Sequence, residues 1–296
     1  MQKPAGMNIA LFGQSFDKVY FPGITRLLRE LDEHGHRLTV FNEFAEFIEQ
    51  HLGRQYSKRF SGHQDLGQPD LMISIGGDGT ILNTLVHIQN REVPVLGINT
   101  GRLGFLSSVS TDQIDDIIQA LRDGSYEIES RSVLEVKSSA DLFTPVNWAL
   151  NEVAVHKNDR SSMITVSAFV NGVYIASYWA DGLIVSTATG STAYSMSCGG
   201  PIVIPESETF VITPIAPHNL NIRPLVVPDR AIIKLVVEGR DNQHLVSLDS
   251  RSETMENTHT LEIRKAGFTM RFLRLPGHHF VETIRNKLMW GLDKRN

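Results

Sequence analysis

The chain has 296 residues, of which 41% are hydrophobic and 21% are charged, so it can bury a large core or two domains and is not intrinsically disordered. The formal net charge of −5 excludes a bulk attraction to nucleic acid or to an anionic membrane, and we expect neither as a partner. A single cysteine, Cys198, excludes a disulfide framework within the chain, and no apolar run reaches membrane-spanning length, so we expect a cytoplasmic protein.

Strands and helices are predicted to alternate over residues 1–125. Pro22 opens a helix that Gly35 ends, and apolar residues recur at helical spacing again in 112–122. Such alternation predicts a Rossmann-like parallel sheet with helices on both faces. The polar stretch 53–69 is expected to be a surface connection. The remaining predicted elements are strands at 8–12, 38–41, 71–75 and 93–98, and helices at 45–52 and 80–89.

Short β-prone segments replace this alternation from about residue 126. Asn171-Gly172 between two of them predicts a β-hairpin. We therefore expect a second domain at 126–275 that is β-rich and β-sandwich-like. The pattern becomes helical again at 280–288, and we expect the tail 276–296 to join the first domain, 1–125. The β-prone runs are 133–136, 153–155, 165–170, 174–178, 183–185, 232–237, 261–263 and 270–273.

The segment LMISIGGDGTILNTL, residues 71–85, combines a buried strand, a glycine turn and a helix. In an open α/β sheet such a turn lies at the carboxyl end of a strand, where ligands bind. Glycines let the backbone approach a ligand and a helix start favours anions, so Gly76, Gly77 and Thr80 are candidate ATP-phosphate contacts. Asp78 repels phosphate, which leaves it two roles: holding a metal ion or taking a proton from a nucleophile. The alternative is a tight turn in which Asp78 caps the helix.

Two common nucleotide-binding fingerprints are missing from the sequence. The pattern G-x-G-x-x-G would need a glycine where Leu82 stands, and no G-x-x-x-x-G-K-[ST] occurs. The dehydrogenase and P-loop interpretations therefore lose their main support. The adjacent His278 and His279 lack a metal-binding spacing, and we assign no metal ligand.

A second cluster of glycines and hydroxyl side chains, ADGLIVSTATGSTAYSMSCGGPI, spans residues 180–202. Its serines and threonines offer hydroxyl donors, and Tyr194 is its single aromatic residue. Such a surface can bind phosphate oxygens and ribose hydroxyls while the aromatic ring stacks on a base. The alternative is a serine-rich turn, and we expect Cys198 to be a small packing residue.

Two shorter motifs allow two interpretations each. In NEV, Asn151 and Glu152 pair an amide with a carboxylate, which can accept hydrogen bonds from two ribose hydroxyls; alternatively they end a polar strand. In NTGRLGFL, residues 99–106, Arg102 can neutralise phosphate charge and Phe105 can pack against a nucleotide base. Otherwise these two are a surface arginine and a core phenylalanine.

Together these motifs resemble the bacterial NAD kinases. They follow the family's order over residues 8–290. GGDGT alone is shared with related lipid and sugar kinases, whereas the block at 181–202 is much more specific. The matching segments are GGDGT (76–80), GINTGRLGFL (97–106), NEV (151–153), DGLIVSTATGSTAYSMSCGGPI (181–202), RPLVVP (223–228) and LDS (248–250).

The resemblance implies transfer of the γ-phosphoryl group of ATP to the adenosine-ribose 2′-hydroxyl of NAD, which produces NADP. It implies a divalent cation, usually Mg²⁺, with ATP as the donor. The implied fold is an α/β domain followed by a β-rich domain with the ligand between them. It also implies a homodimer or homotetramer whose site can borrow residues from a neighbouring subunit.

Residue roles follow from the same resemblance. Asp78 matches the general base for the 2′-hydroxyl, Gly79 and Phe105 match residues near the adenosine, and the Asn151-Glu152 pair matches the contact with the nicotinamide riboside. Asn83 is a departure, because several relatives have a basic residue there. The further dinucleotide contacts implied are Asp181, Thr189, Thr192, Ala193, Tyr194, Ser195, Met196, Ser197, Ala216 and Arg251.

Three other interpretations stay open. A lipid or sugar kinase would share the GGDGT turn but would not need the 192–197 block. A non-enzymatic NAD(P) sensor would bind the dinucleotide without turnover, and the presence of Asp78 argues against it. An NAD-dependent dehydrogenase would lack its usual fingerprint. Incubation with ATP, Mg²⁺ and NAD, compared with diacylglycerol and fructose 6-phosphate as acceptors, separates these functions.

Overall fold

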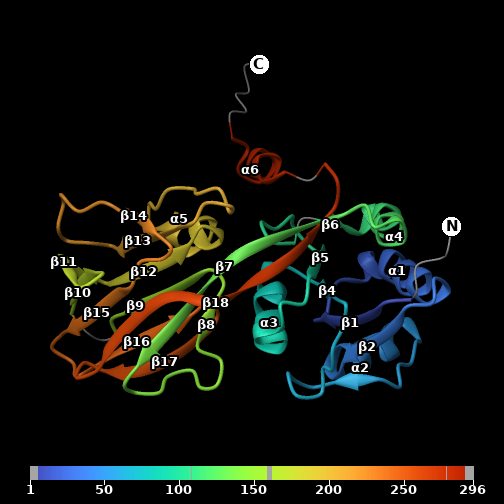
Figure 1. Cartoon of the computed structure of the whole chain (residues 1–296), viewed down its shortest axis with the longest axis horizontal. Helices are drawn as coiled ribbons and strands as arrows, with labels where there is room; N and C mark the ends of the chain where they lie inside the picture. The colour runs from blue at the N-terminus through green and yellow to red at the C-terminus, as the bar shows by residue number, and fades with distance from the viewer. Residues whose placement is uncertain (1–5, 108, 159–161, 278, 291–296) are drawn as a thin grey trace. The chain divides into compact units, whose positions relative to one another are not determined.

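The computed structural model describes residues 6–107, 109–158, 162–277 and 279–290. It contains two compact units, each described here by itself: unit 1 lies within Met1–Ser130 and Met270–Asn296, and unit 2 within Arg131–Thr269. Strands β7 (Glu127–Ser138, green) and β18 (Thr260–Arg274, orange to red) carry the chain from one unit to the other (Figure 1). Within the described ranges, none of the helices has the length and apolar character that a membrane crossing needs.

Unit 1 is built on a parallel sheet in which β3, β2, β1, β4 and β5 lie side by side in that order. Every residue of β4 and β5 is buried, as expected for parallel strands covered on both faces. β5 also pairs in parallel with β6 and with Phe272 of β18. The strand bounds are β1 (Asn8–Gly13), β2 (Arg37–Phe41), β3 (Arg59–Phe60), β4 (Leu71–Ile75), β5 (Val95–Asn99) and β6 (Val109–Ser110).

The helices of unit 1 follow from their sequence patterns. α1 has Pro22 in its first turn and buries one isoleucine and three leucines on one face. α4 buries a similar stripe and ends at Gly124, whose φ of 68° lies in the left-handed region that glycine tolerates best. The helix bounds are α1 (Phe21–Glu33), α2 (Asn42–Leu52), α3 (Asp78–Ile88), α4 (Ile114–Asp123) and α6 (Phe280–Leu288).

Several predicted elements of unit 1 were wrong in their bounds or were missed. α2 begins at Asn42 rather than Ala45, and α3 begins at Asp78 rather than Thr80. The predicted surface connection, 53–69, contains strand β3, whose Phe60 is fully buried. β3 pairs with β2 through only two residues, which is too short a run to produce a periodic signal.

The order of the strands determines where a ligand can bind. From β1 the chain extends through β2 and β3 on one side of the sheet and through β4 and β5 on the other. Open parallel sheets bind ligands at such a reversal, outside the carboxyl ends of the strands. The turn 76–80 follows β4 and the segment 100–107 follows β5, so both lie at this edge of the sheet. The predicted Rossmann-like arrangement is confirmed.

Unit 2 is a sandwich of two antiparallel sheets, which confirms the predicted β-rich fold. One sheet has the order β11-β10-β15-β18, with β7 and β8 attached, and the other has the order β14-β13-β12-β9-β16-β17. Residues of both sheets, such as Val166 of β10 and Val185 of β12, share one core. Asn171 and Gly172 form the predicted hairpin turn, with φ of 50° and 81°.

Within its described residues, unit 2 also has two short helical elements, the 3₁₀ turn at Thr189–Thr192 and the helix α5 (Tyr194–Ser197), and both follow directly after β12. The strand bounds are β8 (Trp148–Ala149), β9 (Glu152–His156), β10 (Ile164–Val170), β11 (Val173–Ala180), β12 (Gly182–Thr187), β13 (Thr209–Ile215), β14 (Leu225–Pro228), β15 (Ile233–Glu238), β16 (Gln243–Leu248) and β17 (Arg251–Glu256).

Candidate active site

The glycine turn after β4 is shaped by its glycines. Gly76 has a φ of 155°, and a Cβ there would overlap the side chain of Thr80. By contrast, a Cβ at Gly77 or Gly79 would meet nothing within 4 Å. The backbone of these two residues therefore borders open space at the start of α3, where unpaired helix N–H groups favour an anion.

Asp78 does not cap α3, so the tight-turn alternative was wrong. The N-cap residue is Gly77, and no side chain caps the helix. The Asp78 carboxylate instead accepts hydrogen bonds from the segment after β5. Its Oδ1 accepts the backbone N–H groups of Leu106 and Ser107, both at 3.0 Å, and the Ser107 hydroxyl at 3.2 Å. Its Oδ2 accepts the N–H of Phe105 at 2.8 Å.

The segment that holds Asp78 is itself fixed by two residues that the sequence did not single out. The buried Asn99 side-chain amide donates to the carbonyl oxygens of Arg102 at 2.6 Å and of Ser107 at 3.3 Å. Gly104 lies so close to Asp78 that a Cβ there would overlap Oδ1. Of the predicted contacts in this segment, the Arg102 residue is exposed, and Phe105 is buried.

The helix α6 contributes a cation next to Asp78. Lys287 Nζ lies 3.9 Å from Asp78 Oδ2 and 4.6 Å from the centroid of the Phe105 ring. Phe280, two turns earlier on the same side of α6, packs against Phe105 with the ring centroids 6.3 Å apart. From the sequence, this helix was expected only to join unit 1.

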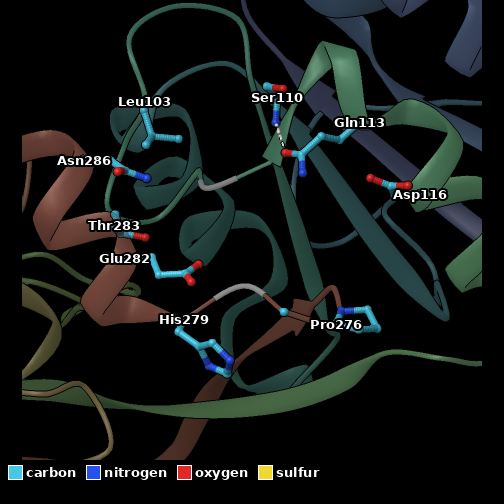
Figure 2. A pocket seen from close by; sticks show the side chains of 10 residues that line it. Leu103, Ser110, Gln113, Asp116, Pro276, His279, Glu282, Thr283 and Asn286 are labelled. Atoms are coloured by element: carbon cyan, nitrogen blue, oxygen red, sulfur yellow. Dashed lines mark hydrogen bonds between the residues drawn. The ribbon is translucent and has the colours of Figure 1, made fainter.

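Another side of α6 lines a cavity of about 470 Å³ within unit 1. Figure 2 shows the hydrogen bond from the Ser110 N–H to Gln113 Oε1 on one side of it and side chains of α6 on the other. Two carboxylates in the lining make the cavity a poor match for a triphosphate. The lining residues are Leu103, Ser110, Gln113, Asp116, Pro276, Gly277, His279, Glu282, Thr283 and Asn286.

Unit 2 holds the Asn151-Glu152 pair through Asp249. The two-residue turn between β16 and β17 contains Asp249, whose φ of 52° is left-handed. Its carboxylate accepts the N–H groups of Leu150 and Asn151, both at 2.8 Å, and of Glu152 at 3.2 Å. Burial raises the pKa of Asp249, and these three donors oppose the rise. The motif LDS was noted in the sequence, but this role of its aspartate was not predicted.

Glu152 is a buried carboxyl with acceptor capacity left over. The side chain accepts the backbone N–H of Tyr194, but among the described residues no donor reaches its buried Oε2. Burial, and secondarily the charge of Asp249, raises the pKa of Glu152 to about 8. A ligand that brings hydroxyl donors would satisfy Oε2 and favour the ionised form.

The hydroxyl side chains of the 187–197 segment mostly have partners within the protein. Thr187 Oγ1 donates to the Leu150 carbonyl at 2.7 Å and accepts the Gly190 N–H at 3.0 Å. The fully buried Ser195 shares a 2.8 Å hydrogen bond with Thr213. Thr189 accepts from Arg131, and Thr192 donates to the Thr189 carbonyl. These contacts shape the turn beside Asn151 rather than present hydroxyl groups to solvent.

The exposed part of this segment is Tyr194. Its ring stacks on His156 with the centroids 5.7 Å apart and the planes at 20°. Burial lowers the pKa of His156, so this ring is neutral at neutral pH. The neighbouring Ala193 and Met196 are half-buried, and Ser197 is exposed.

The other predicted contacts of unit 2 lie at three separate positions. Asp181 forms an ion pair with Lys157 at 2.7 Å. Ala216 follows β13 with a left-handed φ of 44° and is exposed. The Arg251 guanidinium donates to the backbone carbonyls of Val146 and Trp148 and lies 5.8 Å from the Phe143 ring centroid, so it anchors the segment before β9.

Comparison with known proteins gives one consistent family. Residues 25–126 match the model of the ATP-NAD kinase N-terminal domain, and residues 150–275 match that of the C-terminal domain. The chain is 45% identical over 295 residues to an NAD kinase of Flavobacterium psychrophilum, covering 98% of this chain and 100% of the relative. It is 41% identical over 289 residues to an NAD kinase of Bacteroides fragilis, with the same coverage of both chains.

Two solved structures share the fold. Yeast NADH kinase complexed with NADH superposes with a TM-score of 0.86 at 22% identity, covering 99% of this chain and 90% of that one. An NAD kinase from Archaeoglobus fulgidus in complex with ATP gives a TM-score of 0.73 at 28% identity, covering 96% and 98% of the two chains.

Proposed function

The chain belongs to the NAD kinase family, and we propose that it transfers the γ-phosphoryl group of ATP to the adenosine-ribose 2′-hydroxyl of NAD, with Asp78 as the general base. Kinship over nearly the full length supports this over a lipid or sugar kinase, which would share only the GGDGT turn. The base assignment rests on the position of Asp78. Its carboxylate follows β4, where the strand order of the parallel sheet reverses, and backbone N–H groups of Phe105 and Leu106 hold it beside the accessible backbone of the glycine turn.

The hydrogen bonds of Asp78 indicate which of its oxygens would accept the proton. Oδ1 already accepts three donors, whereas Oδ2 accepts one N–H and so has a lone pair for a substrate hydroxyl. A ribose hydroxyl is a weak nucleophile at neutral pH, and a positioned base contributes about 10²–10⁴ in rate. Most of the remaining acceleration in phosphoryl transfer comes from positioning and charge neutralisation.

A divalent cation is part of the proposal. Among the described residues no group of three or more His, Cys, Asp or Glu side chains is arranged to hold a metal ion. Mg²⁺ needs no such group, because it usually keeps several waters and binds through one or two carboxylates together with substrate phosphates. When bound with ATP, the ion would neutralise phosphate charge at the open backbone of Gly77 and Gly79.

Unit 2 would contact the nicotinamide riboside half of the dinucleotide. Glu152 Oε2 is a buried acceptor that a ribose diol can satisfy, and Asn151 beside it offers an amide. Tyr194 is exposed enough to contact a ring of the ligand. Asp181, Ala216 and the exposed end of the 192–197 segment complete the proposed dinucleotide surface, as the family resemblance implies, while Thr189, Ser195 and Arg251 would support its backbone.

We also propose a cytoplasmic homodimer or homotetramer, with residues 1–125 plus 276–296 and 126–275 as its functional domains. A cytoplasmic location fits the substrates, NAD and ATP. An edge of one sheet supports self-association, because β11 exposes Val173, Tyr174, Ile175 and Trp179 at 39–65% of their surface. Light scattering of the purified chain, measured over a range of concentrations, determines the number of subunits.

The proposed reaction is tested with the purified chain, ATP, Mg²⁺ and NAD, with product measured by an NADP-specific dehydrogenase. Asp78→Asn should lower kcat by about 10²–10⁴ while NAD affinity stays within about threefold. Asparagine at position 78 also replaces one of the two oxygens that accept hydrogen bonds from residues 105–107 with an NH₂ donor. Ser107→Ala is therefore the matched control. It removes one hydrogen bond to Asp78 Oδ1 but keeps the carboxylate, and we expect a loss below about tenfold. An Asp78→Asn enzyme within tenfold of the unmodified kcat would remove Asp78 from the base role.

A further inference from the structure

The glycine turn lacks a cation of its own. Residues 71–90, from the start of β4 to just beyond α3, contain no lysine and no arginine. The N–H groups of α3 provide only a partial positive charge. A γ-phosphoryl group that approaches a ribose hydroxyl next to Asp78 would therefore meet a carboxylate and no full positive charge from this part of the chain.

Lys287 supplies that charge from α6. Its ammonium lies 3.9 Å from Asp78 Oδ2, and both side chains are only about one-third exposed. At this distance the ammonium attracts the carboxylate but does not hydrogen-bond to it. The nearby Phe105 ring attracts the ammonium without accepting a conventional hydrogen bond, so the N–H donors of Lys287 remain available to a phosphoryl oxygen.

The reach of Lys287 matches the geometry of the reaction. A base lies about 2.6–3.2 Å from the hydroxyl oxygen that it deprotonates. In a near-attack arrangement that oxygen lies about 3–3.5 Å from the phosphorus. The transferring group thus lies within about 7 Å of Asp78 Oδ2, and a flexible lysine whose nitrogen already lies 3.9 Å from the same oxygen can contact it.

The position of Lys287 in α6 also favours contact with a phosphoryl group. It lies in the last turn of α6, where the helix dipole favours a cation. Phe280, on the same side of the helix, packs on Phe105, whose N–H group holds Asp78 Oδ2. One aromatic contact therefore fixes the cation and the proposed base relative to each other.

We propose that Lys287 is a catalytic residue of the phosphoryl transfer, in which its ammonium binds a non-bridging oxygen of the γ-phosphoryl group. This inference rests on the proposed role of Asp78. In the step, the ribose oxygen forms a bond to the γ-phosphorus and its proton passes to Asp78 Oδ2. The bond from the γ-phosphorus to the β,γ-bridging oxygen breaks, and ADP leaves with that electron pair. The Lys287 ammonium stabilises the negative charge on the transferring group.

The test compares three variants in the full-length enzyme with both substrates varied. Lys287→Met keeps the length of the side chain but removes the charge, and Lys287→Arg restores it. Arg285→Gln removes a positive charge from an exposed position of the same helix and is the matched control. Thermal unfolding and circular dichroism of each variant establish that α6 and unit 1 remain folded.

We expect Lys287→Met to lower kcat/KM for ATP by about 10- to 100-fold while KM for NAD changes less than about threefold. Lys287→Arg should recover at least about one-third of the lost activity on a logarithmic scale, and Arg285→Gln should behave like the unmodified enzyme. A purely structural lysine would instead alter stability and both substrates alike.

Three results would overturn the proposal: Lys287→Met within twofold of the unmodified kcat/KM for ATP, an increase in kcat, or an equal loss with Arg285→Gln. An increase would show that the lysine only restrains Asp78. Failure of the Asp78 assignment is recognised separately, because it would leave Asp78→Asn active whatever the Lys287 variants do.

Discussion

Glu152 should make the free energy of unfolding of unit 2 fall as the pH rises. The perturbation that reveals this is Glu152→Gln, which keeps the shape of the side chain and removes its titration. Glu152 is only 9% exposed and has a buried Oε2 that no donor reaches among the described residues. Burial and the charge of Asp249 raise its pKa from the ordinary value of 4.5 to about 8.

The sign and size of the effect follow from proton linkage. Between pH 4.5 and about 8 the folded chain keeps a proton on Glu152 that the unfolded chain has lost. The free energy of unfolding therefore decreases as the pH rises through this window, by up to about 1.4 kcal/mol for each pH unit. The contribution is fully present below pH 4.5 and is lost above about pH 8, and over the whole window it amounts to at most about 4–5 kcal/mol.

Urea unfolding at pH 5.5 and 7.5 measures the effect, with fluorescence as the probe because Trp148 and Trp179 lie in unit 2. Relative to Glu152→Gln, the unmodified chain should lose about 2–3 kcal/mol between the two pH values. Glu256→Gln, at an exposed glutamate of β17, is the control and should show no such difference. If the unmodified chain and Glu152→Gln change in parallel within about 0.5 kcal/mol, Glu152 is ionised in the folded state and the reasoning fails.

Three further substitutions separate folding from ligand binding. Gly79→Ala should preserve the free energy of unfolding or raise it by up to about 1 kcal/mol, because Gly79 is helical and an added Cβ would meet no neighbouring atom. The same methyl group should raise KM for ATP or NAD at least about tenfold, because it would crowd the backbone that the ligand approaches. Gly79→Ala with unchanged kinetics would show that no ligand approaches the glycine turn. Gly104→Ala, whose Cβ would overlap Asp78, should lower both stability and kcat. Asp249→Asn should cost about 1–3 kcal/mol in urea unfolding and raise KM for NAD more than that for ATP, since three N–H groups around Asn151 share the Asp249 oxygens; equal effects on both substrates would contradict the proposed role of Asn151.

The fold could be predicted wherever burial leaves a periodic trace in the sequence. The apolar stripes of α1 and α4 and the mostly apolar runs of β4 and β5 identified the parallel sheet, and Asn171-Gly172 identified a hairpin. β3 was missed because two paired residues have no period. α3 was started too late because a helix that begins within a glycine turn has no polar capping residue to mark its first turn.

The candidate site could be predicted from the sequence, but the residues that support it could not. A carboxylate between glycines after a buried strand pointed to Asp78, since turn chemistry is local. The groups that hold it, at Phe105 to Ser107, are 27 to 29 residues away, and Lys287 comes from the other end of the chain. No local pattern marks contacts of that separation.

The hydroxyl-rich block was over-interpreted for a related reason. A serine or threonine in a sequence shows a donor without showing where it points. Ser195 and Thr187 use their hydroxyl groups on Thr213 and on the backbone at Leu150, which fixes the turn next to Asn151. These residues therefore determine the backbone conformation of the turn. A backbone held in this way can bind a ligand even when the hydroxyl groups that hold it have internal partners.

The two carboxylates at the centre of the proposal are prepared in opposite ways. Asp78 receives three backbone N–H groups and a hydroxyl from its own unit, so its orientation is set before any substrate arrives. Glu152 has a buried oxygen without a donor among the described residues and holds its proton up to about pH 8. A base must have a fixed direction to reach one hydroxyl, whereas a binding group gains from being unsatisfied, because a ligand that supplies the missing donors removes a cost that other molecules leave in place. The different surroundings of the two acids thus argue for different roles, catalysis at Asp78 and recognition at Glu152.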